Sequence, residues 1–142
     1  MEYKDINTDI VERTLSIIDD YSGEFEVTLL LNCCVGLLVV PKEKHWGKVP
    51  KTVLTESNVL WGLDKSEITF GKKKNYSLNN IVRRMRNSVC HFNIETVADS
   101  QGNINKVVFR DKNRSDPTDT AKITLTCSQL KTFVVNLAQC IK

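Results

Sequence analysis

One short segment, Arg86-Asn87-Ser88-Val89-Cys90-His91, combines residue types that suit chemistry on RNA. Its histidine can exchange a proton near neutral pH, and the arginines in and just before it carry guanidinium groups that fit phosphate. Cleavage of RNA without a metal ion needs a base that takes the 2′-hydroxyl proton and a cation that stabilises the crowded phosphate. The segment therefore indicates phosphodiester chemistry, with His91 as the general base or acid.

A helix over residues 78–91 would hold these side chains. Ser77 can cap its start, and its apolar residues recur at steps of three and four: Leu78, Ile81, Val82, Met85, Val89 and Phe92. At about 100° per residue, Arg86 lies on the flank of this stripe, and the face opposite the stripe carries Arg83, Arg84, Asn87 and His91. Asn87 and His91 are four residues apart and can touch. A polar face that only contacts water explains the same pattern.

A basic segment surrounds the same helix. Residues 71–91 contain no acidic residue and carry a charge of +6 from Lys72, Lys73, Lys74, Arg83, Arg84 and Arg86. The rest of the chain holds 14 basic and 17 acidic residues, so this local charge is large compared with the net charge of +3. The positive electrostatic potential of this segment favours binding of a polyanion such as RNA, and the lysines can contact successive phosphates of its backbone. A solvated lysine loop beside an exposed helix face is the alternative interpretation.

Other residues are weaker candidates for a site. His45, beside Trp46, has no second titratable partner nearby. Cys90 and His91 are neighbours, but adjacent residues on a helix point about 100° apart, which disfavours a nucleophile–base pair. Five cysteines and two histidines show no zinc-ligand spacing and no Cys-x-x-Cys pair. We therefore expect no metal, no cofactor and reduced thiols.

The remaining elements predict a mainly α fold in one domain over residues 1–142. Helices are expected at 8–21 and 24–39, with Pro41 ending the second, and a last helix is expected to begin at the capping-box pattern of Thr126 and Gln129. Three strand-like runs, 92–97, 104–109 and 121–126, predict a small three-stranded antiparallel meander between helix three and the last helix. The prediction is thus a four-helix bundle with this meander. Residues 42–76 are expected to form a short helix and irregular segments.

The chain is expected to be cytoplasmic and without membrane spans. Its polar N-terminus lacks the basic start and apolar run of a signal peptide. The most apolar stretch, residues 27–40, has fourteen residues, whereas a bilayer span needs about 20. This stretch therefore predicts a buried core helix.

The segment from Arg86 to His91 resembles the Arg-x(4–6)-His signature of the HEPN superfamily, in its Arg-Asn-x-x-x-His form. The runs FEVTLLLN (25–32) and PKEK (41–44) are similar to a family of small, plasmid-borne, stand-alone HEPN proteins, and the likeness covers most of the chain. The resemblance implies a four-helix core and a homodimer in which two motif helices face each other. It also implies that Arg86 and His91 are catalytic and that Asn87 orients them.

Active members of the superfamily are metal-independent ribonucleases, often toxins or phage-defence factors. On this interpretation the chain is an endoribonuclease, with RNA as its substrate, a cognate antitoxin as a candidate partner, and substrate-binding residues Asn87, Arg83, Arg84, Lys72, Lys73 and Lys74. Some toxin members have a tyrosine two residues after the histidine that a partner antitoxin modifies. Asn93 occupies that position here, so this form of control is not expected.

Two other interpretations remain open from the sequence. Many HEPN domains are inactive binding modules, so the chain can be a non-catalytic HEPN dimer that binds RNA or a protein partner. It can also be a structural helical domain whose polar helix face contacts only solvent and has no further function.

Overall fold

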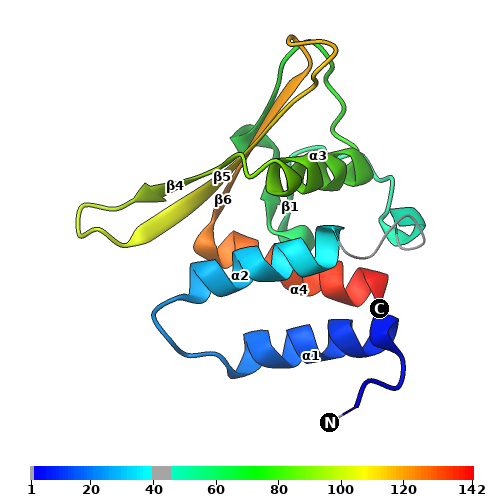
Figure 1. Ribbon diagram of the computed structural model, residues 1–142. Coiled ribbons are helices and arrows are strands. Elements are labelled where there is room, and N and C mark those ends of the chain that lie inside the picture. The colour runs from blue at the N-terminus through cyan, green and yellow to red at the C-terminus, as the bar shows by residue number, and fades with distance from the viewer. Residues whose placement is uncertain (1, 40–45) are drawn as a thin grey trace.

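The computed structural model describes residues 2–39 and 46–142, so the predicted helix end at Pro41 and the candidate His45 lie outside the described residues. Within them, the α-helices are α1 (Ile6–Asp20), α2 (Glu26–Cys34), α3 (Leu78–Cys90) and α4 (Cys127–Ile141). Figure 1 shows α1 at the bottom of the molecule, α2 and α4 above it, and α3 above these beside the β-sheet. α3 contacts both the sheet and the segment that continues α2.

The predicted helices are present, with different ends for the first two. α1 begins two residues earlier than predicted because Asp5 caps it, accepting the Asn7 N–H at 3.1 Å. The predicted helix 24–39 is α-helical only from Glu26 to Cys34 and continues as a π-helix, η1 (Val35–Val39). α4 begins with the predicted capping box, in which the Thr126 and Gln129 side chains accept each other's backbone N–H groups at 3.1 and 2.9 Å.

The predicted three-stranded meander is wrong, because the sheet has four strands in the order β3-β6-β5-β4. The last three strands of the chain are consecutive neighbours: β4 (Ile94–Ala98), β5 (Ile104–Lys112) and β6 (Thr120–Thr126). The fourth, β3 (Ile68–Phe70), comes from before α3 and pairs antiparallel with β6. The fold is therefore four helices packed with a four-stranded antiparallel sheet rather than a helical bundle with an appended meander. β3 was not predicted because three residues are too few to show the alternating pattern of a strand. It is a strand because it pairs with β6.

The region before β3 consists of short helices and strands, where a short helix and irregular segments were predicted over residues 42–76. From residue 46 on, these are the short helices η2 (Trp46–Lys48), η3 (Val59–Trp61) and η4 (Lys65–Glu67) and the two-stranded antiparallel pair β1 (Ser57–Asn58) and β2 (Leu63–Asp64). Of these, η2 and η3 contact α4, and Trp61 of η3 packs against Phe133 of that helix with ring centroids 6.0 Å apart.

One hydrophobic core joins the helices to the sheet. Its fully buried side chains include Met85 of α3, Phe109 of β5 and Phe133 of α4. Burial of this apolar surface holds α3 in place and leaves its polar residues at the edge of the core. No helix among the residues that the structure describes is both long and apolar enough to cross a membrane.

Candidate functional site

α3 carries the residues that the sequence predicts as the site. Its predicted span, 78–91, differs from the observed helix by one residue, and His91 is the C-cap. The predicted apolar stripe faces the core from Leu78 to Val89, with Ile81, Val82 and Met85 fully buried, but its last predicted member, Phe92, lies beyond the helix end and is exposed. Packing of this stripe fixes which way the opposite face of the helix points.

The end of α3 is tied to β5 by a residue inside the motif. Ser88 is buried, donates its hydroxyl to the Asn93 carbonyl at 2.9 Å, and accepts the backbone N–H of Arg110 at 3.1 Å. These bonds hold the turn that follows His91 against the sheet. The position of His91 is therefore set by the helix on one side and by β5 on the other.

Arg84 is buried, which corrects the prediction that it lies on an exposed face. It is 4% exposed and donates through Nη1 to Asp111 at 2.8 Å and through Nη2 to Asp119. Asp111 stands near the end of β5 and Asp119 just before β6. The connection between these strands covers this part of α3, and the periodicity of one helix does not reveal such a cover.

The buried guanidinium and the two carboxylates stabilise each other's charges. Burial alone would lower the pKa of Arg84, but its bonds to Asp111 and Asp119 raise that pKa above the ordinary value. Burial alone would raise the pKa of Asp119, but bonds from Asn113 and Arg84 hold that pKa below the ordinary range. Lys73 adds a more distant contact, with Nζ 4.0 Å from an Asp119 oxygen. The β5–β6 connection is thus anchored to α3 by charged groups.

This anchoring predicts a loss of stability in acid. Because the pKa of Asp119 is below its ordinary value of 3.8 in the folded chain, the unfolded chain takes up the proton first as the pH falls. The contribution of Asp119 to the free energy of unfolding is therefore complete well above that value and declines as the pH falls below it. Urea denaturation of wild type and Asp119→Asn at several pH values checks this. We expect the variant to be less stable at pH 6 and the difference to narrow towards pH 3, and a constant difference would contradict it.

α3 and the anchored connection enclose an open cleft of about 310 Å³, here called the His91 cleft. Its lining residues come from the end of α3 and from the β5–β6 connection: Arg83, Arg84, Asn87, His91, Asp111, Lys112, Asn113, Arg114 and Asp119. Asn87 donates to Asp111 at 3.1 Å, so it is held by the same carboxylate that binds Arg84. The imidazole of His91 is exposed and has no hydrogen bond to the residues that the structure describes.

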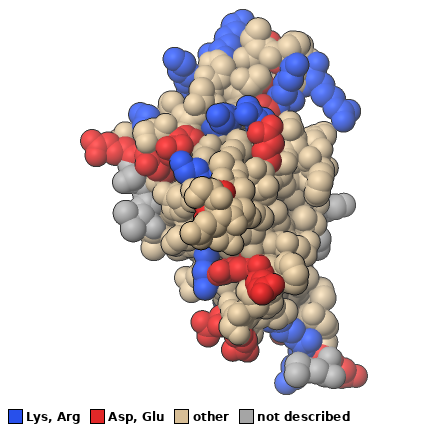
Figure 2. Space-filling model, turned by 90° about the vertical axis from the view of Figure 1, so that its left-hand side faces the viewer, with Lys and Arg blue, Asp and Glu red and all other residues tan. Residues whose placement is uncertain are grey.

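The His91 cleft is positively charged. Its two carboxylates are already paired with Arg84, which leaves the charges of Arg83, Lys112 and Arg114 uncompensated by any ion pair within the described part of the chain. Lys and Arg side chains predominate at the upper end of the molecule in Figure 2, where the β5–β6 connection lies in Figure 1. A phosphate group is the kind of ligand that such a cleft attracts.

His91 also borders a second, smaller cavity of about 70 Å³. Asn93, Arg110, Asp111, Lys112 and Arg114 complete its lining. The Arg110 guanidinium is paired with Glu95 at 3.2 Å. His91 therefore borders two polar cavities, which also share Asp111, Lys112 and Arg114.

The structure brings only some of the predicted site residues together. Arg83 is exposed at the cleft and donates to Asn80 at 2.7 Å. Lys72 lies beside the β5–β6 connection, donating its backbone N–H to the Thr118 carbonyl at 2.9 Å, and the side chains of Lys72, Lys73 and Lys74 are exposed. The three lysines do not line the cleft, so they flank the predicted site.

Arg86 lies outside the His91 cleft. It is five residues before His91, which corresponds to about 140° around the helix axis. It is half-buried and already interacts with other groups of the chain. Within one chain, the cations near His91 are therefore Arg83, Lys112 and Arg114 rather than Arg86.

The family model described as HEPN pEK499 p136 matches residues 1–142. The chain belongs to this HEPN family. The family resemblance predicted from the Arg86–His91 motif and the run 25–32 is thus confirmed. A comparison with curated proteins and one with solved structures found no match.

The β5–β6 half of the HEPN site was missed from the sequence. The predicted strands end at residue 109 and begin again at 121 and assign no role to the connection between them, yet Asp111, Lys112, Arg114 and Asp119 line the cleft. A signal was present, because two acidic residues enclose a basic loop in a chain with a basic helix. Pairing them with Arg84 needs the tertiary fold.

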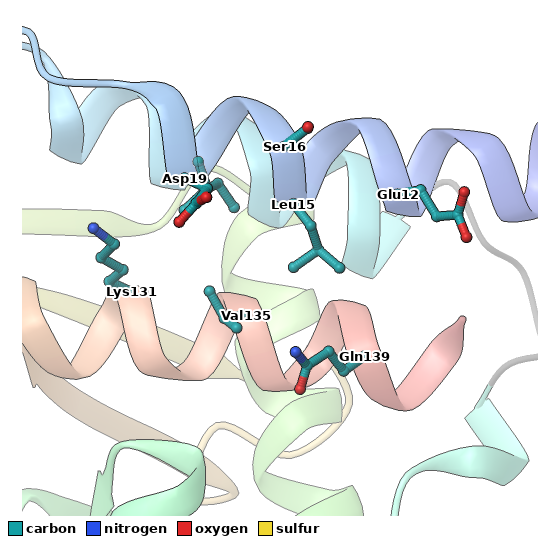
Figure 3. Close-up of a pocket in the computed structure, with 8 residues that line it drawn as sticks. Glu12, Leu15, Ser16, Asp19, Lys131, Val135 and Gln139 are labelled. Atoms are coloured by element: carbon teal, nitrogen blue, oxygen red, sulfur yellow. The ribbon is translucent and has the colours of Figure 1, made fainter.

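A larger cavity of about 380 Å³ lies between α1 and α4 of the HEPN chain (Figure 3). Leu15 and Val135 point towards each other across it, with Asp19 and Lys131 at one end and Glu12 and Gln139 nearer the other. Glu12 pairs with Lys142 at 3.0 Å and Lys131 with Glu26 at 3.4 Å. Glu12 and Lys131 therefore take part in ion pairs with residues that do not line the cavity, and none of the lining residues lines the His91 cleft.

Among residues 2–39 and 46–142 of the HEPN chain, no three His, Cys, Asp or Glu side chains are grouped so that they could hold a metal ion. The five cysteines are free thiols, and burial raises the pKa of Cys34 to about 12. That thiol therefore stays protonated at neutral pH and acts as part of the core.

Proposed function

We propose that this HEPN protein is a metal-independent endoribonuclease that works as a homodimer. The observation that carries the proposal is the position of His91. Its exposed imidazole borders two polar cavities that share Lys112 and Arg114, and neither of these two cations has an ion pair with any described residue. Membership of the HEPN family supports a nuclease or RNA-related role.

The proposed reaction is an attack of an RNA 2′-hydroxyl on the adjacent phosphorus. A base removes the hydroxyl proton, the new P–O2′ bond forms, and the P–O5′ bond breaks as the leaving oxygen takes up a proton. The products are a 2′,3′-cyclic phosphate and a 5′-hydroxyl end. His91 is the base or the acid in this reaction, and the cations beside it stabilise the charge on the phosphate in the transition state.

A homodimer through α3 would complete the site. His91 supplies one of the proton-transfer groups that the reaction needs, and the α3 helix of the partner brings Arg86 to the same phosphate. Arg86 stays a proposed catalytic residue. Because it points about 140° away from His91 on its own helix, its contribution is expected to come across the dimer interface.

Subunit mixing tests this arrangement. Arg86→Ala and His91→Ala are each expected to lose cleavage. If the two residues act together across the interface, random mixing makes half of the dimers mixed, each with one complete pair of groups. Recovery of about a quarter of wild-type cleavage is then the expected result. No recovery from a mixture that has exchanged subunits would show that Arg86 and His91 do not act across the interface.

A second candidate function is a non-catalytic HEPN dimer that binds RNA or a protein partner. The position of Arg86 outside the His91 cleft favours it. Binding to RNA that weakens steeply with salt, without any cleavage at stoichiometric protein, would support this function over the nuclease.

A nuclease of this kind would act as a toxin or phage-defence factor, with a cognate antitoxin as its partner. This part of the proposal rests on the family resemblance alone. Asn93 argues against control by modification of a tyrosine at that position.

A further inference from the structure

The residue after His91 combines an exposed aromatic ring with an unusual backbone. Phe92 is 86% exposed, more than any other large hydrophobic residue in the described part of the chain. Its φ angle is +51°, and among the described residues no other residue except glycine has a positive φ. Both properties are unfavourable for folding, so their combination calls for an explanation.

The backbone angle follows from the way α3 ends. Asn93 donates its N–H to the Ser88 carbonyl at 2.8 Å, and Phe92 donates to the Val89 carbonyl at 3.1 Å. These two bonds form a Schellman motif, which places the residue after the C-cap in the left-handed region. Glycine is the usual residue there because it has no Cβ. The helix end alone would therefore be more stable with glycine than with Phe92.

Packing does not explain the phenylalanine either. A ring that is 86% exposed buries almost none of its apolar surface. Its burial therefore stabilises the fold too little to offset the cost of the strained backbone. Ser88 already fixes the turn to β5 through hydrogen bonds that involve no part of the Phe92 ring. The benefit of the ring must then come from contact with another molecule.

The surroundings of Phe92 are polar and basic. It stands between His91 and Asn93, and both of these line the small cavity that also contains Arg110, Lys112 and Arg114. Phenylalanine and arginine are both enriched at protein interfaces, so a second copy of this chain is the competing partner for this ring. An aromatic ring beside cations is the arrangement by which proteins bind single-stranded nucleic acids: bases stack on the ring, and the cations bind phosphates.

We propose that Phe92 is a stacking platform for an unpaired base, and that the His91 cleft takes single-stranded rather than double-stranded RNA. This inference rests on the proposed function in so far as RNA is the ligand. In a duplex, each base face is covered by its neighbours, so the ring of Phe92 has nothing to stack on. Stacking would hold the strand beside His91, next to Lys112 and Arg114.

Replacement of Phe92 by glycine tests the role of the ring in RNA binding separately from the effect of the residue on the backbone of the turn. Phe92→Gly removes the ring and relieves the backbone, so the melting temperature should rise or stay unchanged. Binding of a labelled single-stranded RNA should weaken by about tenfold or more, because one base stack is lost. Binding of the same sequence as a blunt duplex should be weaker in wild type and unaffected by the change.

Fluorescence anisotropy in a His91→Ala background measures this binding without cleavage. Phe92→Trp should retain the affinity for single strands, because tryptophan also stacks on bases. Phe25→Ala is the matched control: Phe25 is 70% exposed, lines neither His91 cavity, and its loss should leave RNA binding unchanged.

Three results would overturn the inference. The first is equal affinity of Phe92→Gly and its parent for single strands, which includes no measurable binding by either. The second is a lower melting temperature for Phe92→Gly, which would make the ring part of the fold. The third is dissociation of a dimer into monomers, which would make Phe92 a contact with a second copy. Absence of RNA cleavage by wild type, by contrast, counts against the nuclease and leaves the stacking measurement valid.

Discussion

Replacing Arg84 with methionine is expected to lower the free energy of unfolding by about 3–5 kcal/mol. Methionine preserves much of the length and apolar contact of the side chain, so the expected loss is mainly electrostatic. Asp111 and Asp119 would remain buried without their guanidinium partner. Urea denaturation at pH 7 measures the change. The difference in stability from wild type should shrink in acid, because burial raises the pKa of Asp119 once the guanidinium is removed and protonation then neutralises that carboxylate.

Two comparison variants make this prediction specific. Arg110→Met removes a guanidinium that pairs with Glu95 at the surface, where both side chains are well exposed, and should cost less than about 1 kcal/mol. Adding Asp111→Asn and Asp119→Asn to Arg84→Met removes the stranded charges and should restore part of the loss. Similar costs for Arg84→Met and Arg110→Met would contradict a stabilising role of the buried network.

Replacing His91 with alanine is expected to reduce RNA cleavage by at least about 100-fold, the usual contribution of a general acid or base. The effect on stability should be within about 0.5 kcal/mol, because the imidazole is exposed and has no hydrogen bond to a described residue. Initial rates on a labelled single-stranded RNA and thermal melts of the same preparation measure both quantities.

Cys90→Ala is the matched control for this variant. Cys90 is the exposed neighbour of His91 at the end of α3 and lines neither of its two cavities. It should cleave RNA at the wild-type rate, which would also dismiss Cys90 as a nucleophile. A His91→Ala protein that keeps the wild-type rate would remove His91 from the proposed mechanism.

Some of the fold and site follows from local sequence patterns. The apolar stripe from Leu78 to Val89 predicted α3 because its period matches the helix and the core buries these residues. Thr126 and Gln129 predicted the start of α4 because a capping box is formed by neighbouring residues alone. The Arg86–His91 motif likewise indicated the family that the comparison shows.

The features that were missed depend on contacts between distant segments. β3 has three residues and becomes a strand only where β6 accepts it. Arg84 was predicted on an exposed face but is buried. It donates hydrogen bonds to Asp111 and Asp119, which lie 27 and 35 residues further along the chain. The separation of Arg86 and His91 around the helix axis follows from the helical period, but the cations Lys112 and Arg114 beside His91 come from the β5–β6 connection. No period within a single element shows which distant residues will lie beside it.

The ends of the RNA products test the central claim most directly. Purified wild-type protein would be incubated with a defined single-stranded RNA in EDTA, together with the same RNA bearing a 2′-O-methyl group at the cleaved nucleotide. The account predicts cleavage of the first RNA to a 2′,3′-cyclic phosphate and a 5′-hydroxyl, and no cleavage at the methylated position. Cleavage only when a divalent metal is added, products with a 5′-phosphate, or no cleavage at stoichiometric protein would contradict it.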